Sequence, residues 1–298
     1  MNPPKKLIRF DWAIKRLLRD KANPKVLEGF LTSLLGKEIK IIDFLESEGN
    51  KEYADQKSNR VDIVAKDADN NKILIEVQNE TENEYFHRIL FGTSRIIIDH
   101  VKMGQDYGRV PKVYSINIVF FDLGDKSDYV YHGYTDFLGL HSRKPLILRD
   151  SMQKQFRVEH PGDILPEYYI LLAKDFNKWS KTPLEQWMYY LSTDTIPDDA
   201  DAPGLQEARE QLDISRLSAA DRQAYFRHLD NMRSLTSAIQ TAYGDGEMKG
   251  EAKGRAEGKL ESKLESAKIM LADGLPIATI SKYTGLSSEE LENLRNNL

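Results

Sequence analysis

The stretch NRVDIVAKDADNNKILIEVQNE, residues 59–80, contains two short apolar runs on either side of a polar turn. The turn, residues 67–71, is rich in Asp and Asn, which tolerate tight and left-handed backbone. Each run carries one carboxylate among aliphatic side chains, Asp62 in the first and Glu76 in the second. The pattern predicts a β-hairpin centred on Asp69, in which Asp62 lies opposite Glu76.

This register brings polar groups together on one face of the hairpin. Side chains alternate along a strand, so Gln78 shares the face of Glu76, whereas Ile73, Ile75 and Val77 belong to the other, buried face. Two carboxylates in directly opposed positions repel each other. A shared proton, a basic neighbour or a bound cation would relieve the repulsion, and carboxylate oxygens suit a hard cation such as Mg²⁺.

A second interpretation of the same residues needs no ligand. In it, Asp62 bonds to a loop at the strand edge, and Glu76 pairs with a nearby arginine such as Arg60. The pattern of the hairpin alone does not distinguish these two alternatives.

The residues RVDIVAKDADNNKILIEVQ resemble the core of the PD-(D/E)XK nucleases, specifically the recombination-promoting nucleases that are often labelled putative transposases. The resemblance extends upstream through FDWAIKRLL and VLEGFLTSLLG, downstream through FHRILFGTSRIIIDHVKMGQDYGRVPKVYSINIVFF, and into the glycine-rich tail. It implies an α/β fold with a restriction-endonuclease-like αβββαβ core and a mostly helical C-terminal region. The family pattern, an Asp on the second strand and Glu-X-Lys or Glu-X-Gln on the third, maps onto Asp62, Glu76 and Gln78. Lys is more usual than Gln at the last position.

The resemblance implies a DNA endonuclease that depends on Mg²⁺ or Mn²⁺, hydrolyses phosphodiester bonds and is linked to DNA recombination or mobile elements. Asp62, Glu76 and Gln78 would be the catalytic residues. The carboxylates of Asp62 and Glu76, with the carbonyl of Val77, would hold the cation, and Gln78 would orient the attacking water. Glu28, on an upstream helix, is either a further ligand or simply a surface residue.

Two other functions compete with this one. A catalytically silent nuclease fold could bind DNA or serve in assembly, although the acids at the motif positions are intact. A glycosidase with two carboxylates would need a wider separation of the acids.

Local basic segments predict DNA contacts in a chain whose formal net charge is −5. The first 25 residues hold eight basic residues against two acidic ones, a net charge of +6, and include Lys15 and Arg16. A helix predicted over residues 82–103 places Arg88 and Arg95 on one face. Its apolar face is predicted to include Phe86, Leu90, Thr93 and Ile97. The basic N-terminal segment could equally be a solvated helix face, whereas contact with phosphate would add affinity without sequence selection.

The chain divides by pattern into three parts: a nuclease core over residues 1–150, a helical extension and linker over 151–203, and a helical C-terminal region over 204–298. Within the second part, residues 164–191 predict two helices. LILRD, residues 146–150, predicts a strand.

The tail contains a glycine repeat, with Gly246, Gly250, Gly254 and Gly258 spaced by four. Glycine destabilises a helix by about 1 kcal/mol relative to alanine, so the repeat indicates either close helix packing or a flexible connector. Close packing would fit a homodimer formed through the C-terminal helices. The last residues have helix-turn-helix spacing, but their acidic side chains favour an assembly role over reading DNA sequence.

Composition limits the remaining possibilities. The 298 residues are 40% hydrophobic, enough for a sizeable core, and include no cysteine, which excludes disulfides and thiolate metal sites. The sequence has no apolar run long enough for a membrane helix and no signal-peptide pattern, so we expect a cytoplasmic protein without a membrane partner.

Overall fold

The structure is a computed structural model. It describes residues 7–13, 24–45, 63–79, 81–102, 107–124, 127–174, 176 and 182–296.

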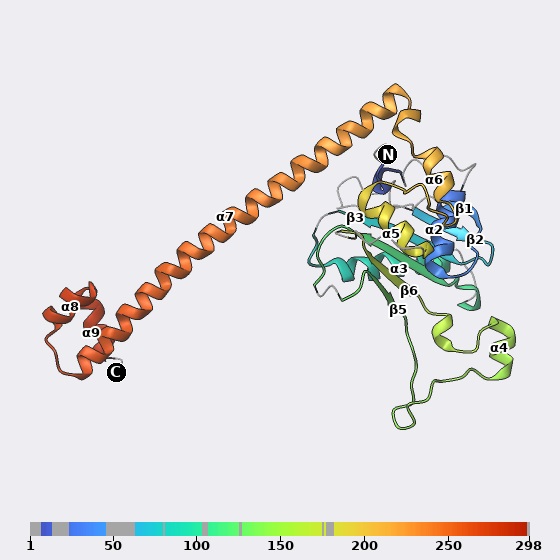
Figure 1. The fold of residues 1–298 in the computed structure, drawn as a ribbon. Coiled ribbons are helices and arrows are strands. Elements are labelled where there is room, and N and C mark those ends of the chain that lie inside the picture. The colour runs from blue at the N-terminus through green and yellow to red at the C-terminus, as the bar shows by residue number, and fades with distance from the viewer. Residues whose placement is uncertain are drawn as a thin grey trace. The chain divides into compact units, whose positions relative to one another are not determined.

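Six strands form one mixed sheet in the order β1-β2-β3-β4-β6-β5 (Figure 1). Their bounds are β1 Ile41–Leu45, β2 Ile63–Asp67, β3 Lys72–Gln78, β4 Val113–Val119, β5 Val130–Gly133 and β6 Glu167–Leu172. Strands β3, β4 and β6 run parallel, and the other pairs are antiparallel. This confirms the predicted α/β fold, and the hairpin supplies the second and third strands of the sheet, β2 and β3.

The hairpin has the predicted register. Ile63 lies opposite Ile75 and Lys66 opposite Lys72. The pairing of Asp62 with Glu76 would extend this register by one residue. Because Asp62 lies outside the described residues, that pairing stays a prediction.

Both faces of β3 are buried. Ile73 and Ile75 on one face are 0% exposed, and so is Leu74 on the other. Helix α3, Tyr85–Lys102, covers the face with Leu74, since a Cβ added at Gly92 would lie 3.7 Å from Cδ2 of Leu74. The face of the predicted acidic patch is therefore covered by protein.

Helix α3 is rotated relative to the prediction. Phe86 and Leu90, predicted on its apolar face, are 56% and 55% exposed, whereas Thr93 is buried as predicted. The residues that turn towards the protein interior follow a spacing of three and four: Tyr85, Arg88, Ile89, Gly92 and Thr93. The prediction was wrong because a charged residue, Arg88, lies on the inward face, where hydrophobic periodicity does not place it.

The remaining helices of this part include α2, α5 and α6, which lie beside one another in Figure 1. Their bounds are α2 Lys25–Leu35, α4 Asp150–Phe156, α5 Pro183–Thr193, α6 Leu205–Gln211, η2 Tyr107–Arg109, η3 Pro161–Asp163 and η4 Ile214–Arg216. An aromatic core joins α2 and α5 to the N-terminal segment: the rings of Phe10, Phe30, Trp187 and Tyr190 contact one another and are buried. The hydroxyl of Tyr190 donates to the carbonyl of Ile8 at 2.8 Å.

Two predictions between residues 146 and 191 were wrong. LILRD forms no strand, because Asp150 begins α4. The first predicted helix of residues 164–191 is instead strand β6, which pairs with both β4 and β5. A short apolar run rich in aromatics fits a buried strand as well as a helix, and here tertiary pairing selects the strand.

The chain separates into two compact units, residues 1–222 and 223–298. Most of the second unit is α7, Ala219–Ala272, followed by α8, Ile277–Thr284, and α9, Ser288–Asn296. The end of α7 and the two short helices share a small core that includes Ala267, Ile280, Leu286 and Leu291. No described helix is both long enough and apolar enough to cross a membrane.

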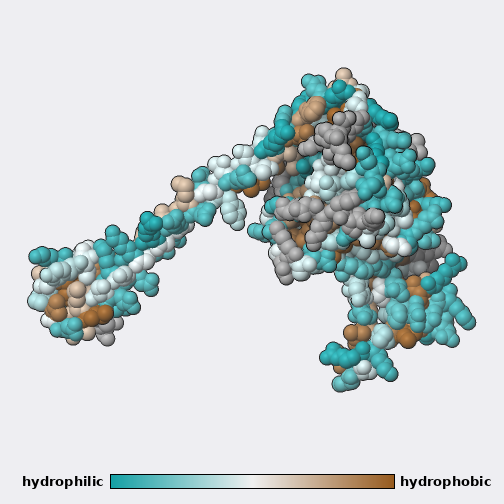
Figure 2. All heavy atoms as spheres, in the orientation of Figure 1, coloured by the Kyte–Doolittle hydropathy of each residue, from teal (hydrophilic) through white to brown (hydrophobic). Residues whose placement is uncertain are grey.

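The glycine repeat lies within the continuous helix α7, which is 54 residues long. A Cβ added at Gly246, Gly250, Gly254 or Gly258 would have no atom within 4 Å. Figure 2 shows mostly hydrophilic and neutral residues along this helix. The repeat is therefore helical, and its glycines make no close contact within the described chain.

Candidate active site

Glu76 and Gln78 lie two residues apart near the carboxyl end of β3, and alternation places them on the same face. Glu76 is 4% exposed, and Gln78 at the end of the strand is half-buried. The carboxyl ends of the three parallel strands meet at this edge of the sheet. Open α/β sheets commonly bind their ligands there.

Arg88 of α3 connects the polar side chains at this edge. Its Nη2 lies 2.5 Å from Oε1 of Glu76. Its Nη1 donates to Oε2 of Glu82 at 2.8 Å and to Oε1 of Gln78 at 3.3 Å. Burial alone would lower the pKa of Arg88, but the carboxylates of Glu76 and Glu82 outweigh burial and raise it. Arg88 is thus a charged basic neighbour of Glu76, the kind of partner that the second interpretation of the hairpin assigned to Arg60.

Asn117 of β4 is a polar residue of this region that the sequence analysis missed. It pairs with Glu76 across the parallel ladder and is 0% exposed. Its Nδ2 donates to the carbonyl and hydroxyl oxygens of Ser115, both at 3.0 Å, and to the carbonyl of Tyr169 at 3.2 Å. A flipped amide would point Oδ1 at two carbonyls, so these acceptors fix its orientation.

The other end of this amide is unsatisfied: Oδ1 of Asn117 has no hydrogen-bond partner among the described atoms. Ser115 and Asn117, at alternate positions of the apolar run VYSINIVFF, are the sequence signal that could have identified this residue.

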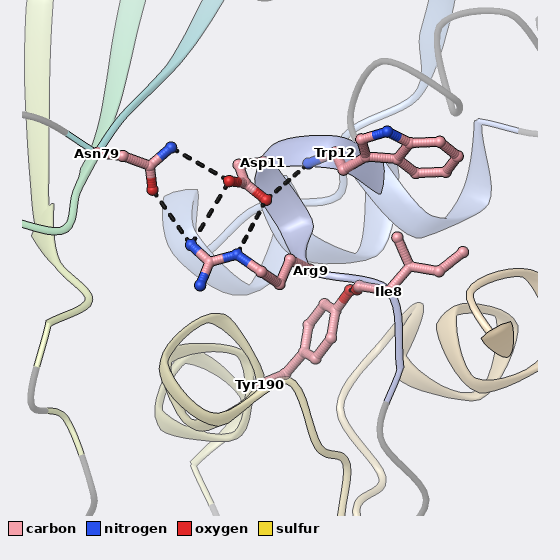
Figure 3. Close-up of polar contacts among 6 residues, drawn as sticks. All are labelled: Ile8, Arg9, Asp11, Trp12, Asn79 and Tyr190. Carbon is pink, nitrogen blue, oxygen red and sulfur yellow. Dashed lines mark hydrogen bonds and ion pairs between the residues drawn. The ribbon is translucent and has the colours of Figure 1, made fainter. Parts of the chain in front are cut away.

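The N-terminal segment, residues 7–13, is attached beside the end of β3 by a second polar cluster (Figure 3). Asp11 is 6% exposed and accepts from Nδ2 of Asn79 at 3.1 Å and from Nε of Arg9 at 3.3 Å. Nη2 of Arg9 donates to Oδ1 of Asn79 at 3.2 Å. Because Asn79 directly follows Gln78, this cluster holds the chain in place next to the candidate site.

The residues predicted to contact DNA are in different environments. Arg88 is largely buried, as described above. Arg95 is 48% exposed, and its Nε lies 3.7 Å from Oδ2 of Asp99, a surface pair of small energetic value. Lys15 and Arg16 lie outside the described residues. DNA contact by all four stays a prediction.

Glu28 lies at the opposite end of the sheet from Glu76. Its Oε1 accepts from the backbone N–H of Ile41, the first residue of β1, and Ile41 pairs with Asp67. Asp67 leads into the hairpin turn, so Glu28 belongs to the turn end of the sheet. The structure thus gives Glu28 a role in fixing β1 and does not bring it to Glu76.

Among the described residues, no group of three or more His, Cys, Asp or Glu side chains could hold a metal ion. Of the predicted ligand set, Glu76 and Val77 are described and Asp62 is not. Glu76 nevertheless fits a cation site, because its buried carboxylate is already matched by a positive charge and its oxygens suit Mg²⁺ or Mn²⁺.

Two family models match parts of this chain. A family model described as "PD-(D/E)XK nuclease family transposase" matches residues 8–242, and one described as "Rpn/YhgA-like nuclease family, C-terminal HTH domain" matches residues 260–296. No curated protein and no solved structure matches the chain. A helix-turn-helix (HTH) domain over α8 and α9 favours DNA binding by these helices over the assembly role expected from their acidic side chains. The first model covers most of the chain, including the strand with Glu76 and Gln78, and the chain therefore belongs to the PD-(D/E)XK nuclease family transposases.

Proposed function

We propose that this protein is a DNA endonuclease that depends on Mg²⁺ or Mn²⁺ and acts in DNA recombination or on mobile elements. The observation that carries the proposal is the buried carboxylate of Glu76 beside Gln78, at the carboxyl end of an inner strand, in a hairpin that has the predicted register from Ile63 to Lys66. Membership in a nuclease family supports the same reaction class.

In this proposal Asp62, Glu76 and the carbonyl of Val77 hold the cation. When bound, a divalent cation polarises the scissile phosphate and lowers the pKa of a coordinated water. Gln78 orients the attacking water by hydrogen bonding. Arg88 donates to Oε1 of Gln78, and this contact would fix the direction of the amide.

DNA would be held by contacts outside the catalytic residues. Lys15, Arg16 and Arg95 are proposed to contact phosphates, which positions the duplex without selecting a sequence. The helix-turn-helix domain would supply further affinity for DNA. We also propose a homodimer through the C-terminal helices, because cutting both strands of a duplex suits two sites related by a two-fold axis.

The proposal is tested by incubating supercoiled plasmid with the purified protein and Mg²⁺. We expect nicked or linear product that EDTA abolishes and that Glu76→Gln lacks. Glu84→Gln is the matched control, because Glu84 is an exposed carboxylate near the start of α3. Equal cleavage by wild type and Glu76→Gln would place the activity elsewhere.

The ion pair between Glu76 and Arg88 favours one alternative, a catalytically silent protein of this fold that binds DNA or serves in assembly. In that case the protein would retain plasmid in a gel-shift assay but leave it uncut with Mg²⁺ and with Mn²⁺.

A further inference from the structure

Arg88 contacts three polar side chains, and these differ in how exposed they are to solvent. It reaches Glu76, whose side chain is 5% exposed, at 2.5 Å and Glu82, whose side chain is 35% exposed, at 2.8 Å. The oxygen of Gln78 is the third acceptor. The guanidinium thus bridges a buried carboxylate and a second carboxylate nearer the surface.

Two buried polar atoms in this region have no hydrogen-bond partner among the described atoms. One is Nε of Arg88, a donor, and the other is Oδ1 of Asn117, an acceptor. Both belong to neighbours of Glu76, one through the ion pair and one through the strand ladder. Unsatisfied buried groups are costly and uncommon in folded proteins. They indicate that this arrangement leaves places for a further polar ligand.

The ion pair occupies the carboxylate that the proposed reaction needs. A divalent cation bound to the same carboxylate oxygen would lie next to the guanidinium, and repulsion between the two positive charges would weaken both contacts. Glu82 offers Arg88 an acceptor that it can keep while leaving Glu76. Once turned outwards, a guanidinium that has lost one carboxylate has donors suited to a phosphate.

We propose that Arg88 and the divalent cation compete for Glu76. Arg88 holds the carboxylate in the cation-free protein, and it turns to a DNA phosphate when the cation binds. This inference rests on the proposed nuclease function, and it assigns Arg88 as a positioning residue that couples cation binding to DNA binding.

The test measures Mn²⁺ affinity by calorimetry on the full chain, without DNA. Arg88→Gln removes the competitor, so we expect Mn²⁺ to bind about tenfold more tightly, within the usual range of coupling between sites. Arg88→Lys keeps the positive charge but lacks the forked guanidinium. Its Mn²⁺ affinity should lie between that of Arg88→Gln and that of the wild type. Arg95→Gln is the matched control on the same helix and should bind Mn²⁺ as the wild type does.

Glu76→Gln separates the inference from the function on which it rests. If Glu76→Gln abolishes Mn²⁺ binding but Arg88→Gln leaves the affinity unchanged, the competition is refuted and the metal site stands. If wild type, Arg88→Gln and Arg88→Lys all fail to bind Mn²⁺, the proposed metal site fails and the inference fails with it.

Thermal unfolding covers the case in which Arg88→Gln is too unstable for calorimetry. Removing one partner of a buried ion pair leaves an uncompensated charge, so this variant should melt below the wild type in EDTA. Mn²⁺ should then raise its melting temperature more than it raises that of the wild type. An equal rise in the two proteins would overturn the proposal.

A DNA-binding assay tests whether Arg88 turns to a phosphate when the cation binds. In the wild type, Ca²⁺ should strengthen binding of a short fluorescent duplex, and part of this gain should disappear in Arg88→Gln but persist in His87→Gln, a change at an exposed residue of the same helix. The same gain in all three proteins would show that Arg88 does not transfer to the phosphate.

Discussion

Gln78, which the family resemblance assigns to a position where lysine is more usual, lies beside an arginine of α3. The side-chain oxygen of Gln78 lies 3.3 Å from Nη1 of Arg88. A lysine would bring a second cation to that guanidinium, whereas the amide offers it an acceptor. A positive charge thus lies beside Gln78, and α3 supplies it.

At this residue we expect Gln78→Ala to lower the rate of plasmid cleavage about 10²-fold, the scale of losing one positioned hydrogen-bonding group. His87→Ala, an exposed change on the adjacent helix, should have no effect on the rate. Cleavage by Gln78→Ala at the wild-type rate would show that the amide has no role.

At the scale of elements, α2 lies very close to the loop that follows α5. A Cβ added at Gly29 would meet the carbonyl oxygen of Pro203 at 2.2 Å, and this backbone atom cannot move aside cheaply. Gly29→Ala should therefore destabilise the first unit by about 1–3 kcal/mol in urea unfolding. Gly92→Ala is the matched control in α3, where the nearest atom is 3.7 Å away. It should be neutral or stabilising by up to about 1 kcal/mol, and a similar loss in both variants would contradict this account.

The start of β6 carries a pH-sensitive contact. Glu167 accepts from Lys112 at 2.7 Å and contacts His132 at 2.8 Å. Burial alone would raise the pKa of Glu167, but these hydrogen bonds hold it below its ordinary value of 4.5. A carboxyl whose pKa is lower in the folded state contributes stability above its ordinary pKa, and this contribution is lost as the pH falls through the folded value.

We therefore expect wild type to be more stable than Glu167→Gln above pH 4.5 and this advantage to shrink below it. Chemical unfolding at a series of pH values measures this difference. Asp99→Asn, at an exposed ion pair, should track the wild type throughout. An advantage that does not change with pH would contradict the linkage.

The elements that the sequence predicted well are those with a strong local pattern. The hairpin was predicted to the register, because alternation and a turn rich in Asp and Asn act over few residues. Strand β6 was missed because its identity depends on pairing with β4 and β5, which lie far away in the sequence. The rotation of α3 was missed because Arg88 turns inwards to meet Glu76.

The residues of the candidate site divide in the same way, into those with a local sequence pattern and those that depend on tertiary contacts. Glu76 and Gln78 could be identified from the motif, whereas Asn117 and Asn79 became visible only through the strand ladder and the N-terminal segment. Polar residues that act through tertiary contacts leave little trace in local periodicity.

At the scale of the whole molecule, contacts within the described part of one chain do not explain the glycines of α7. Its glycines weaken a helix that has little packing along much of its length. With 3.6 residues per turn, Gly246 and Gly250 lie on the same side of α7, and Gly244 lies on nearly the opposite side. A second copy of the helix, packed along the repeat, would bury this side of α7 and would account for its small residues.

If the repeat forms the proposed dimer, Gly246→Ala with Gly250→Ala should weaken the dimer in light scattering over a concentration series. Gly244→Ala should not weaken it, although all three changes raise helix propensity. A chain ending at Tyr243 should be a monomer. A dimer that survives truncation, or a monomeric full-length protein, would refute dimerisation through the tail.

The inner position of β3 also determines at which stage of unfolding the candidate site loses its structure. A strand with neighbours on both edges and cover on both faces exposes its amide hydrogens to exchange mainly when the whole unit opens. We therefore expect the amide of Glu76 to be among the slowest to exchange in the first unit, and fraying of the edge strands β1 and β5 to leave it in place. In a denaturant titration, we expect the Glu76 carboxylate to keep its contacts up to the cooperative unfolding transition of the first unit and to lose them in that transition.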